Sequence, residues 1–250
     1  MAAEVQRNSI EEAPSEVATA VRILHAFAHA YPHAFFIQVG TNDGVELDPL
    51  APFVRDFEWR GIMVEPVPYI FERLRRNVGD ISGITLENVA IADSDGRRPF
   101  YTVEEVKDPE LESLPSWYDL IGSFHRDSLL TFQDSIPDIE DRIVRLEVPC
   151  LSFESLCRKH GVTELDLLLI DVEGYDGELL RSIDFSTRRP RMLIFEHEHL
   201  SNPDRQECYS LLKEQGYELL ALGLDTWCLL PSAVDNRVSA LWRELAVPGT

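Results

Sequence analysis

The chain has 250 residues, of which 44% are hydrophobic and 27% charged, the composition of an ordinary globular protein. Its 23 lysines and arginines against 44 aspartates and glutamates leave a net charge of −21, which argues against a nucleic-acid partner or an anionic membrane surface. The same charge fits either a self-repelling surface or an acidic rim that attracts a cationic substrate.

The lack of a recognisable targeting signal and the spacing of the cysteines both predict a cytoplasmic protein. No apolar run approaches the ~20 residues of a membrane span, and the N-terminus shows no basic region leading into an apolar block, so we expect neither a membrane anchor nor a secretion signal. The four cysteines form no C-x-x-C pair, which argues against a zinc site or a redox dithiol. We expect them to be free, mostly buried thiols.

Residues 1–34 are predicted to form an N-terminal helical extension to one domain that spans residues 35–250. A capping-box spacing, Ser9-x-x-Glu12, marks the start of this extension. Apolar residues then recur at helical intervals, at Val17, Val21, Leu24 and Ala28.

From Phe35 onward, short apolar runs alternate with amphipathic helices, which indicates a parallel sheet covered on both faces. One predicted helix ends at Gly161, a typical C′ residue. A later helix is predicted to have Asn202 as its N-cap and Pro203 as its first residue, and to stop at Gly216. Strands are predicted over residues 35–39, 61–65, 84–91, 165–170, 192–195, 217–222 and 226–230.

The connection between the last two strands fixes their direction. Only Gly223-Leu224-Asp225 joins them, and a parallel crossover needs a dozen or more residues, so this pair must be antiparallel. An antiparallel strand near the end of a parallel sheet is typical of class I methyltransferases rather than of dehydrogenases. We therefore predict an α/β, Rossmann-like class I methyltransferase fold, with a mostly parallel seven-stranded sheet, an antiparallel strand near its end and helices on both faces.

Residues 93–148 interrupt the alternation of strands and helices. They are rich in acids, proline, tryptophan and tyrosine, and they are too long for an ordinary connection. An insertion between the third and fourth strands lies where a lid over a ligand site would lie. We predict a lid or substrate-binding insertion at about residues 93–148.

Ligands of open α/β sheets bind beyond the carboxyl ends of the strands. The first strand ends in Gly40-Thr41-Asn42-Asp43-Gly44, which lets the backbone approach a ligand but lacks the G-x-G-x-x-G dinucleotide fingerprint. Glu65 ends the second strand, at the position where an acid takes both ribose hydroxyls in a nucleotide-binding βαβ unit.

Two further strands end in acids and a histidine. Asp171 and Glu173 follow four aliphatic residues, and Glu196 and His197 end the next strand, which should lie beside the first. Carboxylates with an imidazole make either a general base or an octahedral Mg²⁺ site. We favour His197 as the base, with a pKa raised by the nearby acids, over a metal held by Asp171 and Glu196. Residues 198–199 are expected to be solvated loop residues.

These residues resemble those of a known family, the FkbM-type methyltransferases, which use S-adenosylmethionine. The resemblance runs from about Phe35 to about Leu200, and its most specific part is the Ile-Asp-Val-Glu-Gly block. The resembling segments are Phe36–Gly44, Val64–Pro66, Asn88–Ile91, Gly122–Phe124 and Ile170–Gly174.

The resemblance implies roles for residues of the predicted cofactor site. It implies that Glu65 holds the ribose and that residues 88–90 border the adenine. It also implies that Asp171 and Glu173 lie near the transferred methyl group, with Ser123 touching the cofactor. The full set of predicted cofactor-binding residues is Gln38, Gly40, Asn42, Asp43, Glu65, Pro66, Asn88, Ala90, Ser123 and Asp171, and the predicted catalytic residues are Asp171, Glu173 and His197.

The predicted function is O-methylation of a hydroxyl on a small-molecule acceptor, such as a natural product, sugar or peptide, with S-adenosylmethionine as cofactor and Mg²⁺ as a less favoured addition. A homo-oligomer is compatible with the sequence. The alternatives are N-methylation of a cationic small molecule, an NAD-dependent oxidoreductase on the same kind of sheet, and an inactive nucleotide-binding or scaffolding protein.

Overall fold

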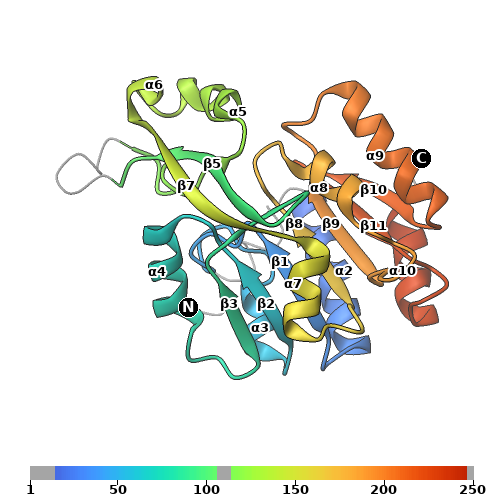
Figure 1. Cartoon of the computed structure of the whole chain (residues 1–250). Coiled ribbons are helices and arrows are strands. Elements are labelled where there is room, and N and C mark those ends of the chain that lie inside the picture. The colour runs from blue at the N-terminus through green and yellow to red at the C-terminus, as the bar shows by residue number, and fades with distance from the viewer. Residues whose placement is uncertain (1–14, 106–113, 247–250) are drawn as a thin grey trace, which may run out of the picture.

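The computed structural model describes residues 15–105 and 114–246 (Figure 1). Seven strands form the larger of two sheets in the order β10-β11-β9-β8-β1-β2-β3. Their bounds, in that order, are Glu218–Leu222, Asp225–Leu229, Met192–Glu196, Leu167–Ile170, Phe35–Val39, Arg60–Val64 and Ile84–Glu87.

Six of the seven strands run in one direction. The neighbours from β9 to β3 all pair in parallel, whereas β11 pairs antiparallel with both β9 and β10. The predicted antiparallel connection through residues 223–225 is therefore confirmed, and the odd strand lies one place inside the sheet edge rather than at the edge itself. The predicted α/β fold with a mostly parallel seven-stranded sheet is confirmed as well.

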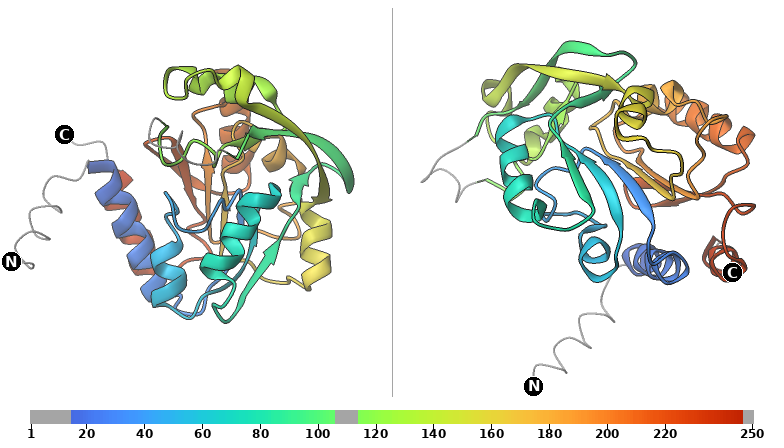
Figure 2. Two further views of the ribbon diagram at one scale, coloured as in Figure 1. Left: turned by 90° about the vertical axis from the view of Figure 1, so that its left-hand side faces the viewer. Right: turned by 60° about the horizontal axis from the view of Figure 1, so that its bottom comes forward.

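Helices cover both faces of this sheet, as predicted. On one face lie α2 (Ser15–Ala30), α3 (Ala51–Asp56), α4 (Pro68–Val78) and α10 (Asn236–Ala246). On the other face lie α7 (Phe153–His160), α8 (Asp176–Ser182) and α9 (Asn202–Glu214). The helices α2 and α10 come from opposite ends of the chain and lie side by side (Figure 2). Among the described residues, no helix is long and apolar enough to cross a membrane.

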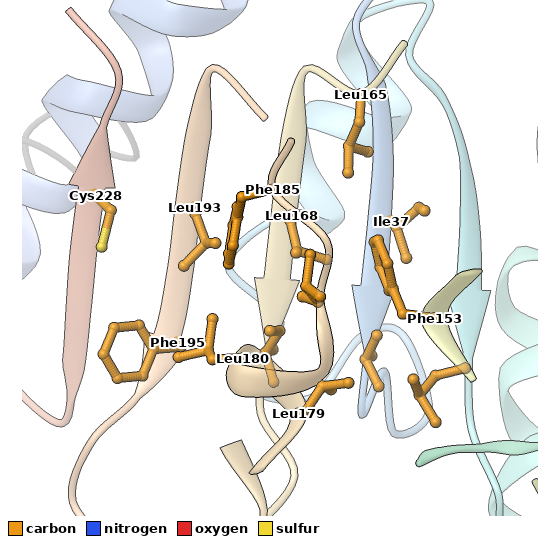
Figure 3. Close-up of a cluster of buried hydrophobic side chains, with 14 of the residues drawn as sticks. Ile37, Phe153, Leu165, Leu168, Leu179, Leu180, Phe185, Leu193, Phe195 and Cys228 are labelled. Carbon is orange, nitrogen blue, oxygen red and sulfur yellow. The ribbon is translucent and has the colours of Figure 1, made fainter. Parts of the chain in front are cut away.

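The central strand β8 is apolar at every position because both of its faces are buried. In β8, Leu168 and Ile170 pack toward α7 and α8, whereas Leu167 and Leu169 pack toward α2 and α10. Figure 3 shows the first of these layers, where Leu168 and Leu193 of adjacent strands meet the helix side chains. All four cysteines are free and buried, as expected.

A second, four-stranded sheet crosses one end of the main sheet (Figure 1). Its strands, in the order β4-β7-β5-β6, are Ala90–Ala92, Ile143–Ser152, Gly96–Val103 and Gly122–Ser123. Three short helices accompany it, namely α5 (Arg126–Leu130), η2 (Thr131–Asp134) and α6 (Ile139–Arg142). This unit contains the segment predicted to be an insertion at about residues 93–148, together with the strands on either side of it.

Two predicted elements differ from the structure. The strand predicted over residues 84–91 is two strands in two sheets, because Asn88 leaves the main sheet and its side-chain amide donates to the carbonyls of Glu65 and Pro66 at 2.8 and 3.1 Å. The N-cap of α9 is Ser201 rather than Asn202, because the Ser201 hydroxyl accepts from the Asp204 amide.

Other boundaries of the prediction compare more closely with the structure. Gly161 ends α7 in the left-handed conformation, with φ of 62°, as its C′ assignment requires. The predicted capping box at Ser9 and Glu12 lies outside the described residues.

Candidate functional site

The turn after β1 fits tightly against the end of β8. Gly40 has φ of 79°, and a Cβ at this position would lie 1.6 Å from the carbonyl oxygen of Asp171, so only glycine fits here. Asn42 also has a left-handed backbone, with φ of 54°. The backbone amides of Gly40 and Thr41 donate to the Val64 carbonyl at 3.1 Å each, which holds the turn between β2 and β8.

Two predicted cofactor residues in this region, Gln38 and Asp43, have hydrogen-bond partners within the protein. Gln38 is 2% exposed, and its amide nitrogen donates to Asp48 at 3.2 Å. The Asp43 carboxylate accepts from the backbone amides of Val45 and Glu46 at 2.9 Å each, and so closes the loop that follows β1. Neither side chain belongs to the lining of the pocket described below.

Glu65 is buried at the end of β2, with 3% exposure. Its carboxylate accepts from the backbone amides of Val67 at 2.7 Å and Asn42 at 3.2 Å. Burial raises the pKa of Glu65 from 4.5 to about 8, and these two hydrogen bonds only partly offset that effect. Each carboxylate oxygen has a second lone pair, so the group can still accept from the two hydroxyls of a ribose.

A pocket opens directly beside Glu65, with an empty volume of about 490 Å³, part of it open to solvent. The main sheet and the second sheet both contribute apolar walls, including Val39, Val64, Phe100 and Phe124. Of the predicted site residues, the structure brings Gly40, Asn42, Glu65, Pro66, Ala90, Asp171 and Glu173 to this lining.

Asn88 and Ser123 stand behind the lining rather than in it. The side chain of Asn88 holds the turn after Glu65, as described above. Ser123 is fully buried, and its hydroxyl donates to the carbonyl of Glu173 at 2.8 Å and accepts from the amide of His125 at 3.1 Å. This pair of bonds ties the second sheet to the loop that follows β8.

Carboxylates gather where β8 and β9 end. In the register of these strands Ile170 lies opposite Phe195, so Asp171 and Glu196 emerge at the same level. Burial, and then the Glu173 carboxylate, raise the pKa of Asp171 well above its usual range. Burial and the Asp171 carboxylate raise the pKa of Glu196 in the same way.

Three more acids surround this group. Asp176 is fully buried, and burial raises its pKa to about 7. Burial also raises the pKa of Asp225, at the start of β11, to about 6. Asp48, in the loop after β1, has a raised pKa for the same reason. The acids that meet here are therefore Asp48, Asp171, Glu173, Asp176, Glu196 and Asp225, and we call them the acidic cluster. Such a cluster can attract a cation or accept a proton from a substrate.

The histidine that reaches the acidic cluster is His199, which the sequence interpretation placed in a solvated loop. Its Nε2 lies 3.2 Å from Oε2 of Glu173 and 3.7 Å from Oε1 of Glu196, and its side chain is 13% exposed. The Glu173 carboxylate raises the pKa of His199. Helical-type spacing from Glu196 (i, i+3) is the only signal in the sequence that could have indicated this contact.

His197 lies apart from the acidic cluster. It is 6% exposed, and its Nδ1 lies 3.1 Å from the hydroxyl of Thr226 in the adjacent strand β11. Burial lowers the pKa of His197, so the expected rise caused by nearby acids is wrong. The reason is that successive residues point to opposite sides of an extended chain, so Glu196 and His197 cannot both face Asp171.

Comparison with known proteins gives one family. Residues 38–219, more than two thirds of the chain, match the methyltransferase FkbM domain. The chain belongs to the FkbM methyltransferase family. Family membership supports the use of S-adenosylmethionine and sets aside the alternative of an NAD-dependent oxidoreductase. The main sheet, with β11 antiparallel between β9 and β10, accordingly has the class I methyltransferase arrangement.

Three solved structures that resemble the chain are distant from it in sequence. An FkbM methyltransferase from Methylobacillus flagellatus KT has a TM-score of 0.47 and 13% identity over 79% of this chain and 44% of its own. A precorrin-6y C5,15-methyltransferase from Geobacter metallireducens GS-15 has a TM-score of 0.40 and 10% identity over 84% and 86%. A ribosomal protein L11 methylase from Lactobacillus delbrueckii subsp. bulgaricus has a TM-score of 0.40 and 12% identity over 85% and 76%.

These structural likenesses carry no conclusion about the acceptor, because their TM-scores lie below 0.5. No curated protein matches the chain.

Proposed function

We propose that this protein methylates a hydroxyl group of a small-molecule acceptor, with S-adenosylmethionine bound in the pocket beside Glu65. The observation that carries the proposal is one pocket with apolar walls whose lining includes the buried carboxylate Glu65. Asp171 and Glu173, where the acidic cluster begins, belong to the same lining. The family membership supports methyl transfer.

The residues present fit the cofactor. Glu65 keeps free lone pairs toward the pocket and can accept from both ribose hydroxyls. Apolar walls that include Val89, Ala90 and Phe100 suit the faces of an adenine ring. When bound, S-adenosylmethionine supplies an electrophilic methyl group.

The acceptor must be aligned with that methyl group and must lose a proton, because a neutral alcohol is a weak nucleophile. Asp171 lines the pocket, and its ionised form accepts the proton; burial and the Glu173 carboxylate raise its pKa, which makes that form a stronger base. Glu173, the next acid on the same lining, orients the acceptor oxygen. His197, bonded to Thr226 and absent from the lining, has no part in this proposal.

Exposed apolar side chains lie at the same edge of the main sheet as the acidic cluster. Leu47 follows β1 and is 78% exposed, and Leu224 precedes β11 and is 57% exposed. The beginning of β11 is paired with the end of β9, which brings the turn at Leu224 close to Glu196. Neither residue belongs to the pocket lining, and single exposed apolar side chains set no requirement on the acceptor.

Binding experiments test the cofactor part of the proposal. In isothermal titration calorimetry, S-adenosylhomocysteine should bind with one site per chain, whereas NAD should not bind. Glu65→Ala should weaken this binding by roughly 1–3 kcal/mol, because charge-assisted bonds to the ribose are lost. Glu58→Ala, at a side chain that is 86% exposed, is the control and should bind normally. Absence of S-adenosylhomocysteine binding to the wild-type protein would refute the proposal.

Transfer of a labelled methyl group to panels of alcohols and amines tests the acceptor part. Asp171→Asn should reduce turnover on an accepted alcohol by roughly 10²–10⁴-fold while binding of S-adenosylhomocysteine persists. If only cationic amines were methylated, the alternative of an N-methyltransferase would replace the proposal. The buried Glu196 Oε2, which has no hydrogen-bond partner among the described residues, is the observation that favours that alternative.

A further inference from the structure

The side chains of Glu173, Glu196 and His199 converge on one point from two different loops. Glu173 follows β8, Glu196 ends β9, and His199 lies three residues further on. One carboxylate oxygen from each glutamate and one ring nitrogen of the histidine lie within 4.8 Å of one another. Adjacent ligands of an octahedral ion, held at about 2.1 Å, stand about 3.0 Å apart, and opposite ones about 4.2 Å apart. The two separations from Nε2 of His199, 3.2 Å to Glu173 and 3.7 Å to Glu196, lie within this range.

Internal hydrogen bonds do not account for this arrangement. Oε2 of Glu173 and Oε2 of Glu196 are buried, and neither has a hydrogen bond among the described residues. The Glu196 side chain as a whole is about nine-tenths buried. Nε2 of His199 lies 3.2 Å from Oε2 of Glu173 and 3.7 Å from Oε1 of Glu196, so the imidazole is the one basic group beside these two carboxylates in the described part of the chain, and Oε2 of Glu196 is left without a partner there. Buried carboxylate oxygens are costly to leave without a partner. A positive charge that binds between them would satisfy both.

The surroundings make the need for a cation greater. Beyond burial, Asp171, Glu173, Asp176 and Asp225 all act on Glu196 through their negative charge and raise its pKa. The ring of Phe132, from η2, lies 5.3 Å from the ring of His199 and covers the site on one side. A single histidine is therefore set among several acids, under an aromatic cover.

We propose that Glu173, Glu196 and His199 bind a divalent metal ion of the Mn²⁺ type at the acceptor side of the pocket. Two carboxylates and one imidazole form a mixed oxygen and nitrogen set, which Mn²⁺ accepts more readily than Mg²⁺ does. This set differs from the pair Asp171 and Glu196 that the sequence suggested for Mg²⁺. Three protein ligands leave positions open for water or an acceptor oxygen, and Glu173 also lines the pocket.

The ligand set also favours a metal ion over the ammonium group of a substrate. An ammonium group is satisfied by carboxylates alone and gains little from an imidazole, which becomes a competing cation when it is protonated. Neutral imidazole is instead one of the commonest metal ligands. The presence of His199 at the centre, rather than a further acid, is the feature that distinguishes the two occupants.

Titration of the metal-free full-length chain with Mn²⁺, followed by electron paramagnetic resonance of the free ion, tests the proposal. We expect one bound Mn²⁺ per chain, with affinity reduced at least tenfold in Glu196→Gln and in His199→Ala. His33→Ala is the matched control, because His33 also lies 3.2 Å from a glutamate, Glu58, but is 69% exposed on the surface. This control should bind Mn²⁺ as the wild-type protein does. Mg²⁺ should displace the ion only at concentrations at least tenfold higher.

A second measurement needs no substitution, in case a variant does not fold. Electron spin echo envelope modulation of Mn²⁺ bound to the wild-type protein should show coupling to a directly coordinated imidazole nitrogen. The proposal is overturned if the wild-type protein binds no stoichiometric Mn²⁺ at millimolar concentrations, if the imidazole coupling is absent, or if both variants bind as the wild type does. Binding of methylammonium without binding of Mn²⁺ would also overturn it. None of these readouts requires S-adenosylmethionine, so failure here is distinct from failure of the proposed methyl transfer.

Discussion

The burial of Glu65 can be tested through the pH dependence of the free energy of unfolding. Burial raises the pKa of Glu65 from 4.5 to about 8 in the folded state. Between these values the folded protein keeps a proton on Glu65 that the unfolded chain has lost. The free energy of unfolding therefore falls as pH rises from about 4.5 to about 8. Above about pH 8 the contribution of Glu65 to that free energy no longer changes.

The magnitude follows from the two pKa values. A difference of about 3.5 pH units, at about 1.4 kcal/mol per unit, corresponds to about 5 kcal/mol in total. Between pH 5 and pH 8 the expected loss is about 3–4 kcal/mol, since the transition is gradual at both ends. Glu65→Gln removes the titration, so its stability relative to wild type should rise by this amount over the same interval.

Urea unfolding of both proteins at pH 5, 6, 7 and 8, without cofactor, measures this difference. Glutamine keeps one acceptor for the amides of Val67 and Asn42, so the variant also carries a constant penalty that does not depend on pH. The groups that shift the pKa of Glu65 include no other carboxylate, so the acidic cluster cancels in the comparison. A constant difference between wild type and Glu65→Gln from pH 5 to pH 8 would refute the reasoning.

Three other outcomes follow from the same site. Ionised Glu65 is the better acceptor for ribose hydroxyls, so calorimetry should show S-adenosylhomocysteine binding more tightly as pH rises toward 8, by up to about tenfold per unit, but not in Glu65→Gln. Gly40→Ala should lower the free energy of unfolding by about 3 kcal/mol or more, because the added Cβ would meet the Asp171 carbonyl. Gly161→Ala is the control, because Gly161 also has a left-handed φ but no atom within 4 Å of the added Cβ, and it should cost only about 1–2 kcal/mol. Equal costs would contradict the steric argument. Residues 114–135 should exchange amide hydrogens more slowly when S-adenosylhomocysteine is bound. Ser123→Ala removes the hydrogen bond to the Glu173 carbonyl and should reduce that protection. An unchanged exchange pattern on binding would refute the lid hypothesis.

The main sheet could be predicted from the sequence because its signal is local. Continuous apolar runs such as Leu167–Ile170 indicate strands buried on both faces, and the short turn at residues 223–225 fixes an antiparallel pair. Glycine at position 40 and the acid at position 65 mark the ends of β1 and β2 for the same reason. The residues at each strand end can therefore be predicted from one short segment of the sequence.

The second sheet could not be predicted because its pairing is not local. Residues 96–103 in β5 pair with residues 143–150 in β7, across about forty intervening residues. The burial pattern of β7 mixes exposed and half-buried positions, so no clean alternation marks it as a strand. The break at Asn88 was hidden for a related reason, since its side chain bonds to carbonyls of the β2 exit, which are remote in sequence.

The acidic cluster was predicted in part, and its error has a physical origin. Asp171, Glu173 and Glu196 were found because a polar residue directly after a buried strand is conspicuous. The choice of His197 over His199 failed because direction, not proximity in sequence, decides which side chain faces the site. His197 still belongs to the extended chain and points toward Thr226, whereas the turn that follows returns His199 to the side of Glu196.

Glu173 joins the parts of the site that the sequence treated separately. Its backbone is left-handed, with φ of 52°, a conformation that costs a non-glycine residue about 1 kcal/mol or more. Its carbonyl accepts from Ser123 of the second sheet, its side chain reaches His199, and it also lines the pocket beside Glu65. A relaxed conformation would turn either the carbonyl away from Ser123 or the carboxylate away from His199. The strain at Glu173 is therefore held by both contacts at once, which couples the position of the covering sheet to the geometry of the acidic cluster.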